Sequence, residues 1–152
     1  MERTAEKTSL ERELTIAASP ETVWEFLVDP DKATRWMGQE CSFDPRPGGV
    51  YRCAVIPGHT ASGEFVELDP PRRVVFTWGF DGDQRATLAG SSRVEVVLEP
   101  EGSDGTRLML SHHDLPASAR PSHKQGWDHY LERLARAAAG DPPGRDPWLA
   151  TD

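Results

Sequence analysis

Hydrophobic and polar residues alternate in six short stretches through the middle of the chain, and residues typical of turns separate the stretches. The alternation is clearest at Val94, Val96 and Leu98, whose neighbours are mostly charged. Leu14 and Ile16 mark an earlier stretch of the same kind. Because the six later stretches follow one another through short turns, we expect them to pair as an antiparallel meander. The expected strands are residues 10–17, 40–44, 49–56, 60–69, 73–80, 91–99 and 106–113.

The last hydrophobic pattern, over residues 122–139, has the period of a helix instead. Ser122 and Gln125 have the spacing of a capping box, and Gly140 is expected to end the helix. A helix with large aromatic residues on its buried stripe must lie against a broad surface, so we expect it to lie across the sheet and to leave a cavity there. The expected stripe is His123, Trp127, Tyr130, Leu131, Leu134 and Ala138.

Two shorter helical segments are expected between the first strand and the second. Ser19 and Pro20 are typical of a helix start, with serine as the cap and proline in the first turn. Asp29-Pro30 is expected to end that helix and to begin another turn or two, through Met37. The predicted order is one strand, two short helices, six strands and a long helix, which is an α+β fold.

Composition and charge narrow the function classes. The 152 residues are enough for one domain, and the formal net charge of −8 argues against a nucleic-acid-binding surface. No apolar run approaches the ~18 residues of a membrane span, and the charged N-terminus has no signal-peptide core, so we expect a cytoplasmic protein. Cys41 and Cys53 flank an expected hairpin turn and could face each other, but in a reducing cytosol we expect two free thiols.

Several short stretches, in this order and spacing, resemble the START-like (SRPBCC, helix-grip) superfamily, and within it the branch of activator of heat-shock-protein-90 ATPase homologues. The resemblance spans about residues 10 to 148. Asp114 departs from the pattern, which has glycine there. The matching stretches are residues 19–24, 29–30 with 35–36, 48–51, 63–68, 70–78, 112–116, 123–127 with 130–131, and 146–148.

The resemblance implies a curved, seven-stranded antiparallel sheet that grips the C-terminal helix, with two short helices after the first strand. It also implies a pocket between sheet and helix that holds hydrophobic small molecules in related proteins. We therefore expect a flexible N-terminus over residues 1–9, a single START-like domain over 10–140 and a Pro/Gly-rich tail over 141–152, with Trp148 pinning the tail to the surface.

Aromatic and histidine side chains are the candidates for the ligand-binding wall. His112 follows the inward positions of its strand, and His123 lies on the helical stripe, so each could contact a ligand or act as an acid or base. The alternative for each is a structural histidine bonded to a backbone carbonyl, and the aromatic residues could simply fill the core. Gly126 lies inside the expected helix, where glycine is unfavourable. It indicates a close approach of helix and sheet, room for a ligand, or a glycine that is merely tolerated near the first turn. The candidates are Trp36, Tyr51, Phe65, Trp78, His112, His123, Trp127 and Tyr130.

No catalytic or metal-binding constellation is apparent. Ser111 and His112 are adjacent on a strand and point to opposite faces, so they cannot form a triad with Asp114. His123 and His129 lie about 240° apart around the helix and cannot share a metal. We therefore expect no catalytic residue, no metal and no cofactor.

Three functional hypotheses remain. The first is a cytosolic domain that binds a hydrophobic or aromatic small molecule, as a monomer or homodimer, with no nucleic acid and no membrane span. The second is a module that regulates the ATPase of the chaperone heat-shock protein 90, and thus a stress-response role. The third is a cyclase- or hydrolase-type enzyme that uses His112 or Tyr130.

Overall fold

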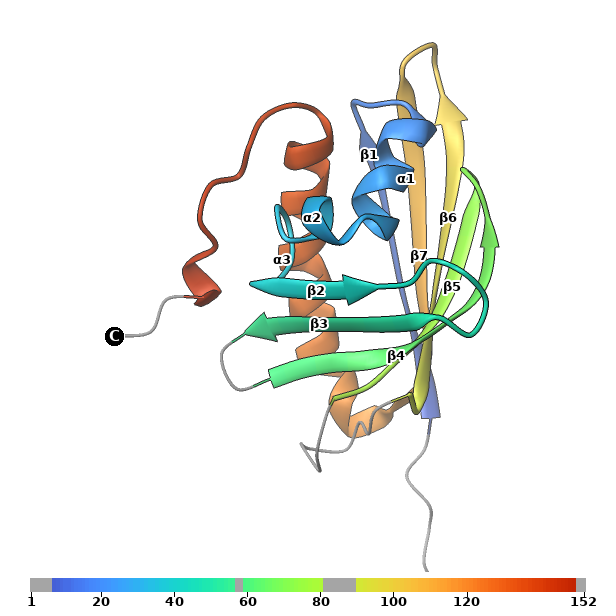
Figure 1. Ribbon diagram of the computed structural model, residues 1–152, viewed down its shortest axis with the longest axis vertical. Helices are drawn as coiled ribbons and strands as arrows, with labels where there is room; N and C mark the ends of the chain where they lie inside the picture. The colour runs from blue at the N-terminus through green and yellow to red at the C-terminus, as the bar shows by residue number, and fades with distance from the viewer. Residues whose placement is uncertain (1–6, 57–58, 81–89, 150–152) are drawn as a thin grey trace, which may run out of the picture.

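The computed structural model describes residues 7–56, 59–80 and 90–149, which form an antiparallel sheet and helices that cover one of its faces (Figure 1). The predicted α+β fold is confirmed. Residues 1–6 and 150–152, the turn expected at 81–84 and most of the turn at 57–59 lie outside the described residues. The strands are β1 (Lys7–Ile16), β2 (Glu40–Phe43), β3 (Val50–Ile56), β4 (His59–Asp69), β5 (Arg73–Trp78), β6 (Ser92–Glu101) and β7 (Gly105–Pro116). The helices are α1 (Pro20–Val28), α2 (Pro30–Ala33) and α3 (Arg120–Ala138), with 3₁₀ turns η1 (Ala117–Ala119) and η2 (Pro147–Leu149).

The sheet order is β1-β7-β6-β5-β4-β3-β2, so the six later strands form a meander and the first strand closes onto the last. In Figure 1 β2 and β3 lie across the view, whereas β6, β7 and β1 run upright. The change of direction occurs along β4. There a side chain at Gly63 would overlap the carbonyl oxygen of Thr77 on β5, and the neighbouring Glu64 amide donates to the Thr77 hydroxyl at 2.8 Å. Glycine at 63 therefore permits the close approach that curves the sheet.

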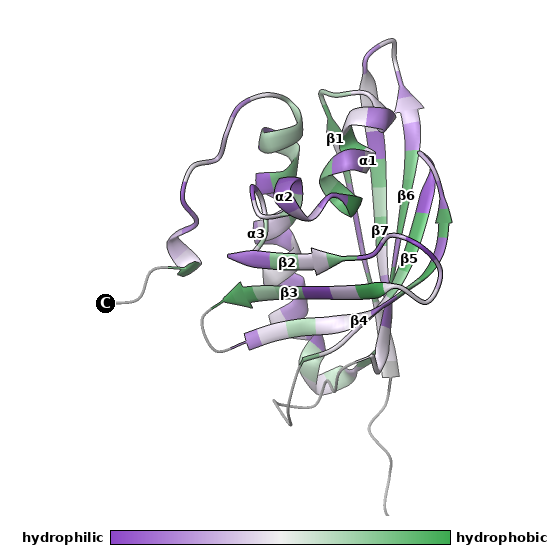
Figure 2. Ribbon diagram, in the orientation of Figure 1, coloured by the Kyte–Doolittle hydropathy of each residue, from purple (hydrophilic) through white to green (hydrophobic). Residues whose placement is uncertain are grey.

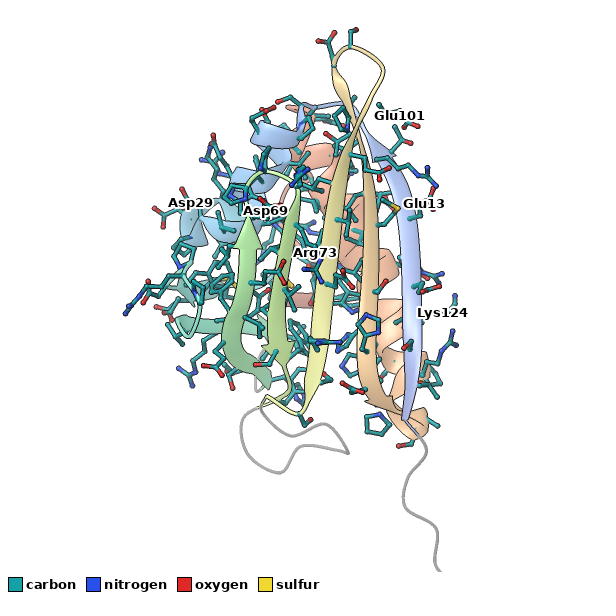
Figure 3. The ribbon with its side chains drawn as sticks, turned by 90° about the vertical axis from the view of Figure 1, so that its right-hand side faces the viewer. Glu13, Asp29, Asp69, Arg73, Glu101 and Lys124 are labelled. Atoms are coloured by element: carbon teal, nitrogen blue, oxygen red, sulfur yellow. A yellow bond between two sulfur atoms is a disulfide. The ribbon has the colours of Figure 1, made fainter. Side chains whose placement is uncertain are left out.

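One face of the sheet carries the core and the other carries charge. Val94, Val96 and Leu98 of β6 are buried, as their alternation predicts. On the outer face, Arg73 of β5 pairs with Glu95 of β6 at 2.7 Å. Figure 3 views this outer face, and Figure 2 shows that β3 and β5 each carry both hydrophobic and hydrophilic residues. All six residues of the predicted α3 stripe are buried.

The start of α3 differs from the prediction. The helix begins at Arg120, directly after η1, and its capping position is Ala119, which makes no side-chain bond. Ser122 lies inside the first turn, where its hydroxyl donates to the Ala119 carbonyl at 3.1 Å, so the predicted capping box is wrong. Pro121 does not prevent the earlier start because first-turn amides need no helical partner. The end of the helix is as expected, with Gly140 at φ +86°.

The two short helices follow the predicted capping pattern. The Ser19 hydroxyl accepts a hydrogen bond from the Thr22 amide at 3.2 Å at the start of α1. Asp29 ends α1 and caps α2, where its side chain accepts from the Asp31 amide at 2.9 Å. These caps fix both helices at the end of the sheet that lies away from η1 (Figure 1).

The expectation of two free cysteines is corrected. Cys41 on β2 and Cys53 on β3 are direct partners in the strand register, with Cα atoms 4.1 Å apart, and a disulfide joins them. The symmetric placement of the two cysteines about the hairpin turn makes them neighbours across the strand pair and so brings their sulfur atoms together.

Asp114 occupies a backbone conformation that favours glycine. Its φ is +65°, in the left-handed region. It lies in a bulge, because Thr8 pairs with Leu115 while Leu10 pairs with His112, which leaves two β7 residues opposite one β1 residue. The glycine that the related pattern has at this position is therefore explained by the bulge.

We expect Asp114→Gly to raise the free energy of unfolding by about 0.5 kcal/mol, since glycine removes the left-handed strain but costs some chain entropy. Asp114→Ala should lower it by about 1 kcal/mol, because alanine lacks the short polar group that makes this region tolerable for aspartate. Urea unfolding of the two variants measures both effects. A more stable alanine variant would contradict the assignment of strain to this residue.

Candidate functional site

A pocket of about 210 Å³ lies between the first half of α3 and the adjoining ends of β3, β4 and β5, and it is open on one side. Its surface is mainly apolar, and none of its described lining residues is Asp, Glu, Lys or Arg. A concave apolar site with few polar groups is the usual form of a small-molecule site. The lining residues are Val55, Ile56, His59, Trp78, Phe80, Ser122, His123, Gly126, Trp127, Tyr130 and Trp148.

Four of the eight predicted candidates line this pocket, namely Trp78, His123, Trp127 and Tyr130. The other four, Trp36, Tyr51, Phe65 and His112, do not. They share nearly complete burial: Tyr51 is 2% exposed and His112 is 0% exposed.

The three aromatic residues outside the pocket belong to the core. Tyr51 stacks on Phe76 with ring centroids 3.9 Å apart, and Phe65 meets Tyr51 edge to face at 5.5 Å. The Trp36 indole N–H donates to the Phe26 carbonyl at 2.8 Å and so ties the end of α2 to α1. Trp36 and Tyr51 also border a separate void of about 10 Å³, which is about the size of one water.

Several lining residues were not predicted, namely Val55, Ile56, His59, Phe80 and Ser122. They come from the ends of strands and from the first turn of α3. Strand and helix periods identify the face on which a residue lies, but they do not indicate how far along the element the cavity sits.

Two indole–imidazole hydrogen bonds hold the Trp78 and Trp127 rings of the pocket wall in place. The Trp78 Nε1–H donates to His123 Nε2 at 3.2 Å, and the Trp127 Nε1–H donates to His112 Nδ1 at 3.0 Å. The two tryptophan rings lie 5.3 Å apart and the two imidazoles 5.2 Å apart, measured between centroids. We call these four residues the Trp–His cluster. It joins β5 and β7 to α3.

The cluster fixes the tautomer of each histidine because an indole N–H can only donate. His112 accepts at Nδ1, so its Nε2–H donates to the Ser92 hydroxyl at 2.8 Å, and that hydroxyl donates to the Trp78 carbonyl at 2.7 Å. His123 accepts at Nε2, so its Nδ1–H donates to the Ala119 carbonyl at 2.8 Å. All four ring nitrogens therefore have partners, and both imidazoles are neutral.

The burial of the cluster also affects its protonation. Burial lowers the pKa of His112 well below its ordinary value, and the neighbouring His123 and His113 lower it further. Burial likewise lowers the pKa of His123, although the hydrogen bond to Ala119 acts in the opposite direction. Neither imidazole has a free nitrogen with which to take a proton from a bound molecule.

Tyr130 is also committed to a structural bond. Its hydroxyl donates to the Val55 carbonyl at 3.3 Å, and burial, with the negative charge of Asp146, raises its pKa. Within residues 7–56, 59–80 and 90–149, no group of three His, Cys, Asp or Glu side chains is placed to hold a metal ion. No helix in these ranges is long and apolar enough to cross a membrane.

Gly126 faces open space. A side chain at this position would meet no atom within 4 Å outside its own helix, and Gly126 lines the pocket. Close packing of helix on sheet, one of the three explanations considered for this glycine, is therefore wrong. The missing side chain leaves volume in the pocket.

The C-terminal tail folds back onto α3 and supplies the last wall of the pocket. Asp146 is 2% exposed and accepts from His129 Nε2 at 2.8 Å and from the Trp148 amide at 2.9 Å. Arg133 lies 3.6 Å from the other carboxylate oxygen and donates to the Gly144 carbonyl at 2.8 Å. The Trp148 ring stacks on His129 with centroids 3.7 Å apart. Trp148 thus holds the tail as expected, and it lines the pocket as well.

We expect the stability of the protein to fall as the pH drops below about 6.5, because His112 and His123 gain protons more readily in the unfolded chain than in the folded one. Their contribution is complete above pH 6.5 and is lost progressively towards their lower folded pKa values. In urea unfolding between pH 7.5 and 5.5, His112→Gln should reduce the average slope by about 0.7 kcal/mol per pH unit, since glutamine keeps both hydrogen bonds without titrating. An unchanged slope would mean that the fold does not lower the pKa of His112.

We expect Asp146→Ala to release the tail, because it leaves His129 and Arg133 without their buried partner. Tryptic cleavage after the exposed Arg145 should accelerate by at least about tenfold. Asp141→Ala is the matched control, since among the described residues the Asp141 carboxylate pairs only with the exposed Arg136. Equal cleavage rates in the two variants would show that Asp146 does not hold the tail.

Comparisons with known proteins agree with this architecture. Among solved structures, an AHSA1-like protein from Rhizobium etli is 40% identical and matches 100% of this chain and 95% of its own, with a TM-score of 0.74. DynU16, a protein in the dynemicin biosynthetic locus, is 25% identical over 92% of this chain and 50% of its own, with a TM-score of 0.77. An HSP90 activator from Plasmodium falciparum is 25% identical over 87% of this chain and 96% of its own, with a TM-score of 0.72.

A comparison with curated proteins gives no match. The family model of activator of Hsp90 ATPase homolog 1-like proteins matches residues 17–139, from the end of β1 to the end of α3. The chain therefore belongs to the family of activator of Hsp90 ATPase homolog 1-like proteins.

Proposed function

We propose that this protein binds a small hydrophobic or aromatic molecule in the pocket between α3 and the ends of β3, β4 and β5. The observation that carries the proposal is the pocket of about 210 Å³ with aromatic walls, into which Gly126 projects no side chain. An apolar cavity of this size can hold a ring-sized molecule, since a cavity of ~150 Å³ holds benzene. The membership of DynU16 in a biosynthetic locus supports a role with small molecules.

The proposal depends on space at Gly126, which a substitution can remove. We expect Gly126→Leu to fill the pocket and to weaken the binding of aromatic fragments by at least about tenfold, the effect of losing ~1.4 kcal/mol of apolar contact. The fragments would be selected by native mass spectrometry and thermal shift, and their affinities measured by NMR titration. The indole N–H signals of Trp78 and Trp127 report directly on the pocket wall.

Gly126→Ala is the matched control, since it adds one methyl group and removes the helix cost of glycine. It should raise the free energy of unfolding by about 1 kcal/mol and retain most of the binding. If no fragment shifts the two indole signals of the wild-type protein, the proposed function is wrong. Equal fragment affinities in the wild type and a folded Gly126→Leu variant would place the binding elsewhere.

A second function, regulation of the chaperone ATPase, has its own support. The family takes its description from an activator of Hsp90 ATPase, and the Plasmodium falciparum relative is an HSP90 activator. An ATPase assay with purified chaperone and increasing amounts of this protein tests it. Stimulation that survives in Gly126→Leu would show a role that is independent of the pocket, and no stimulation would rule the role out.

A further inference from the structure

The polar side chains on the α3 and β5 walls of the pocket are uniform in what they can offer a ligand. The Trp78 and Trp127 indole N–H groups are both donated within the Trp–His cluster, and His123 uses its only N–H on the Ala119 carbonyl. None of these three residues has a polar hydrogen left for a bound molecule.

The two hydroxyl groups of the wall also donate their hydrogens to backbone carbonyls. The Ser122 hydroxyl donates to the Ala119 carbonyl at 3.1 Å, and the Tyr130 hydroxyl donates to the Val55 carbonyl at 3.3 Å. Each hydroxyl oxygen keeps lone pairs that can accept. On the α3 and β5 walls, therefore, the side chains of the described residues present acceptors and no donors.

Two half-buried residues, His59 and Trp148, carry the remaining polar side-chain groups among the described lining residues. His59 makes a ring contact with Phe80, and no hydrogen bond of its imidazole falls within the described residues. A neutral imidazole both donates and accepts, so His59 does not select between ligand types. The indole N–H of Trp148, on the wall formed by the C-terminal tail, can only donate, and so it differs from the α3 and β5 walls.

Charge limits the ligand in a second way. No described lining residue is Lys or Arg, so a carboxylate or phosphate would enter an apolar site without a counter-charge. The buried carboxylate of Asp146 raises the pKa of Tyr130 on the pocket wall, and the Arg133 guanidinium lowers it, so these two charges oppose each other there.

We infer that the ligand of this pocket is a one- or two-ring aromatic molecule that carries a hydroxyl or N–H donor and no negative charge. The inference rests on the proposed function and refines it. The ring occupies the space beside Gly126 against Trp78 and Trp127, and the donor bonds to the oxygen of Ser122 or Tyr130. A phenol, a naphthol or an indole has this chemistry.

Three probes of nearly equal shape test the inference: 2-naphthol, 2-methoxynaphthalene and 2-naphthoate. We expect 2-naphthol to bind at least about tenfold more tightly than the methoxy compound, which lacks a donor and leaves an acceptor unpaired. We expect the naphthoate to bind at least about 100-fold more weakly than 2-naphthol. NMR titrations that follow the indole signals of Trp78 and Trp127 give the three dissociation constants.

Two variants assign the acceptor. Ser122→Ala or Tyr130→Phe should bring the affinity for 2-naphthol down to that for the methoxy compound, while the affinity for the methoxy compound changes by less than about twofold. Ser118→Ala is the matched control, because Ser118 is exposed and lies outside the pocket. Urea unfolding verifies that each variant is folded.

The outcomes separate the inference from the proposed function. If 2-naphthol and 2-methoxynaphthalene bind equally tightly to the wild type, and both bind more weakly to Gly126→Leu, the pocket binds aromatic molecules and the donor requirement is wrong. Tighter binding of the naphthoate would also overturn the inference, since the charge argument would fail. If none of the probes binds in a way that depends on Gly126, both the inference and the proposed function are wrong.

Discussion

The placement of α3 on the sheet depends on the need of two buried indole N–H groups for acceptors. A polar group that is buried without a partner costs roughly 1–3 kcal/mol, so Trp78 and Trp127 require acceptors inside the core. Each finds an imidazole on the opposite layer: Trp78 of β5 bonds to His123 of α3, and Trp127 of α3 bonds to His112 of β7. Because the bonds run in both directions between the layers, neither the helix nor the sheet can shift without breaking one of them.

The same cluster decides what the pocket can do. His112 and His123, the cluster histidines that could have acted as acid or base, form hydrogen bonds that hold the pocket wall together. The wall is therefore a rigid aromatic surface with few polar atoms. The pocket consequently has the features of a binding site, and His112, His123 and Tyr130 are engaged in structural hydrogen bonds. The tail adds the final aromatic wall through Trp148, so the site combines residues from the sheet, the long helix and the last described turn.

Much of the fold was predictable from the sequence, because burial imposes a period on each element. The strand alternation predicted the ends of all seven strands to within a few residues, and all six residues of the predicted α3 stripe are buried. The predicted capping box at Ser122 was wrong because the helix begins two residues earlier, at Arg120. Arg120 and Pro121 also fit a first helical turn, and the spacing of Ser122 and Gln125 alone does not reveal this. The site was only half predictable, since the depth of a cavity depends on how elements cross. Phe65 and Trp78 both point to the core side, yet only Trp78 lies where the pocket opens.

The pairing of β1 with β7 has a consequence for how the protein folds. Lys7 is opposite Pro116 and Ile16 is opposite Thr106, so the sheet closes only when segments about a hundred residues apart meet. Closing so long a loop loses chain entropy before any hydrogen bond is gained. Sheets dominated by such distant pairings fold on the scale of milliseconds to seconds. We expect the meander from β2 to β6 to form as a local unit, and the arrival of β1 to limit the folding rate.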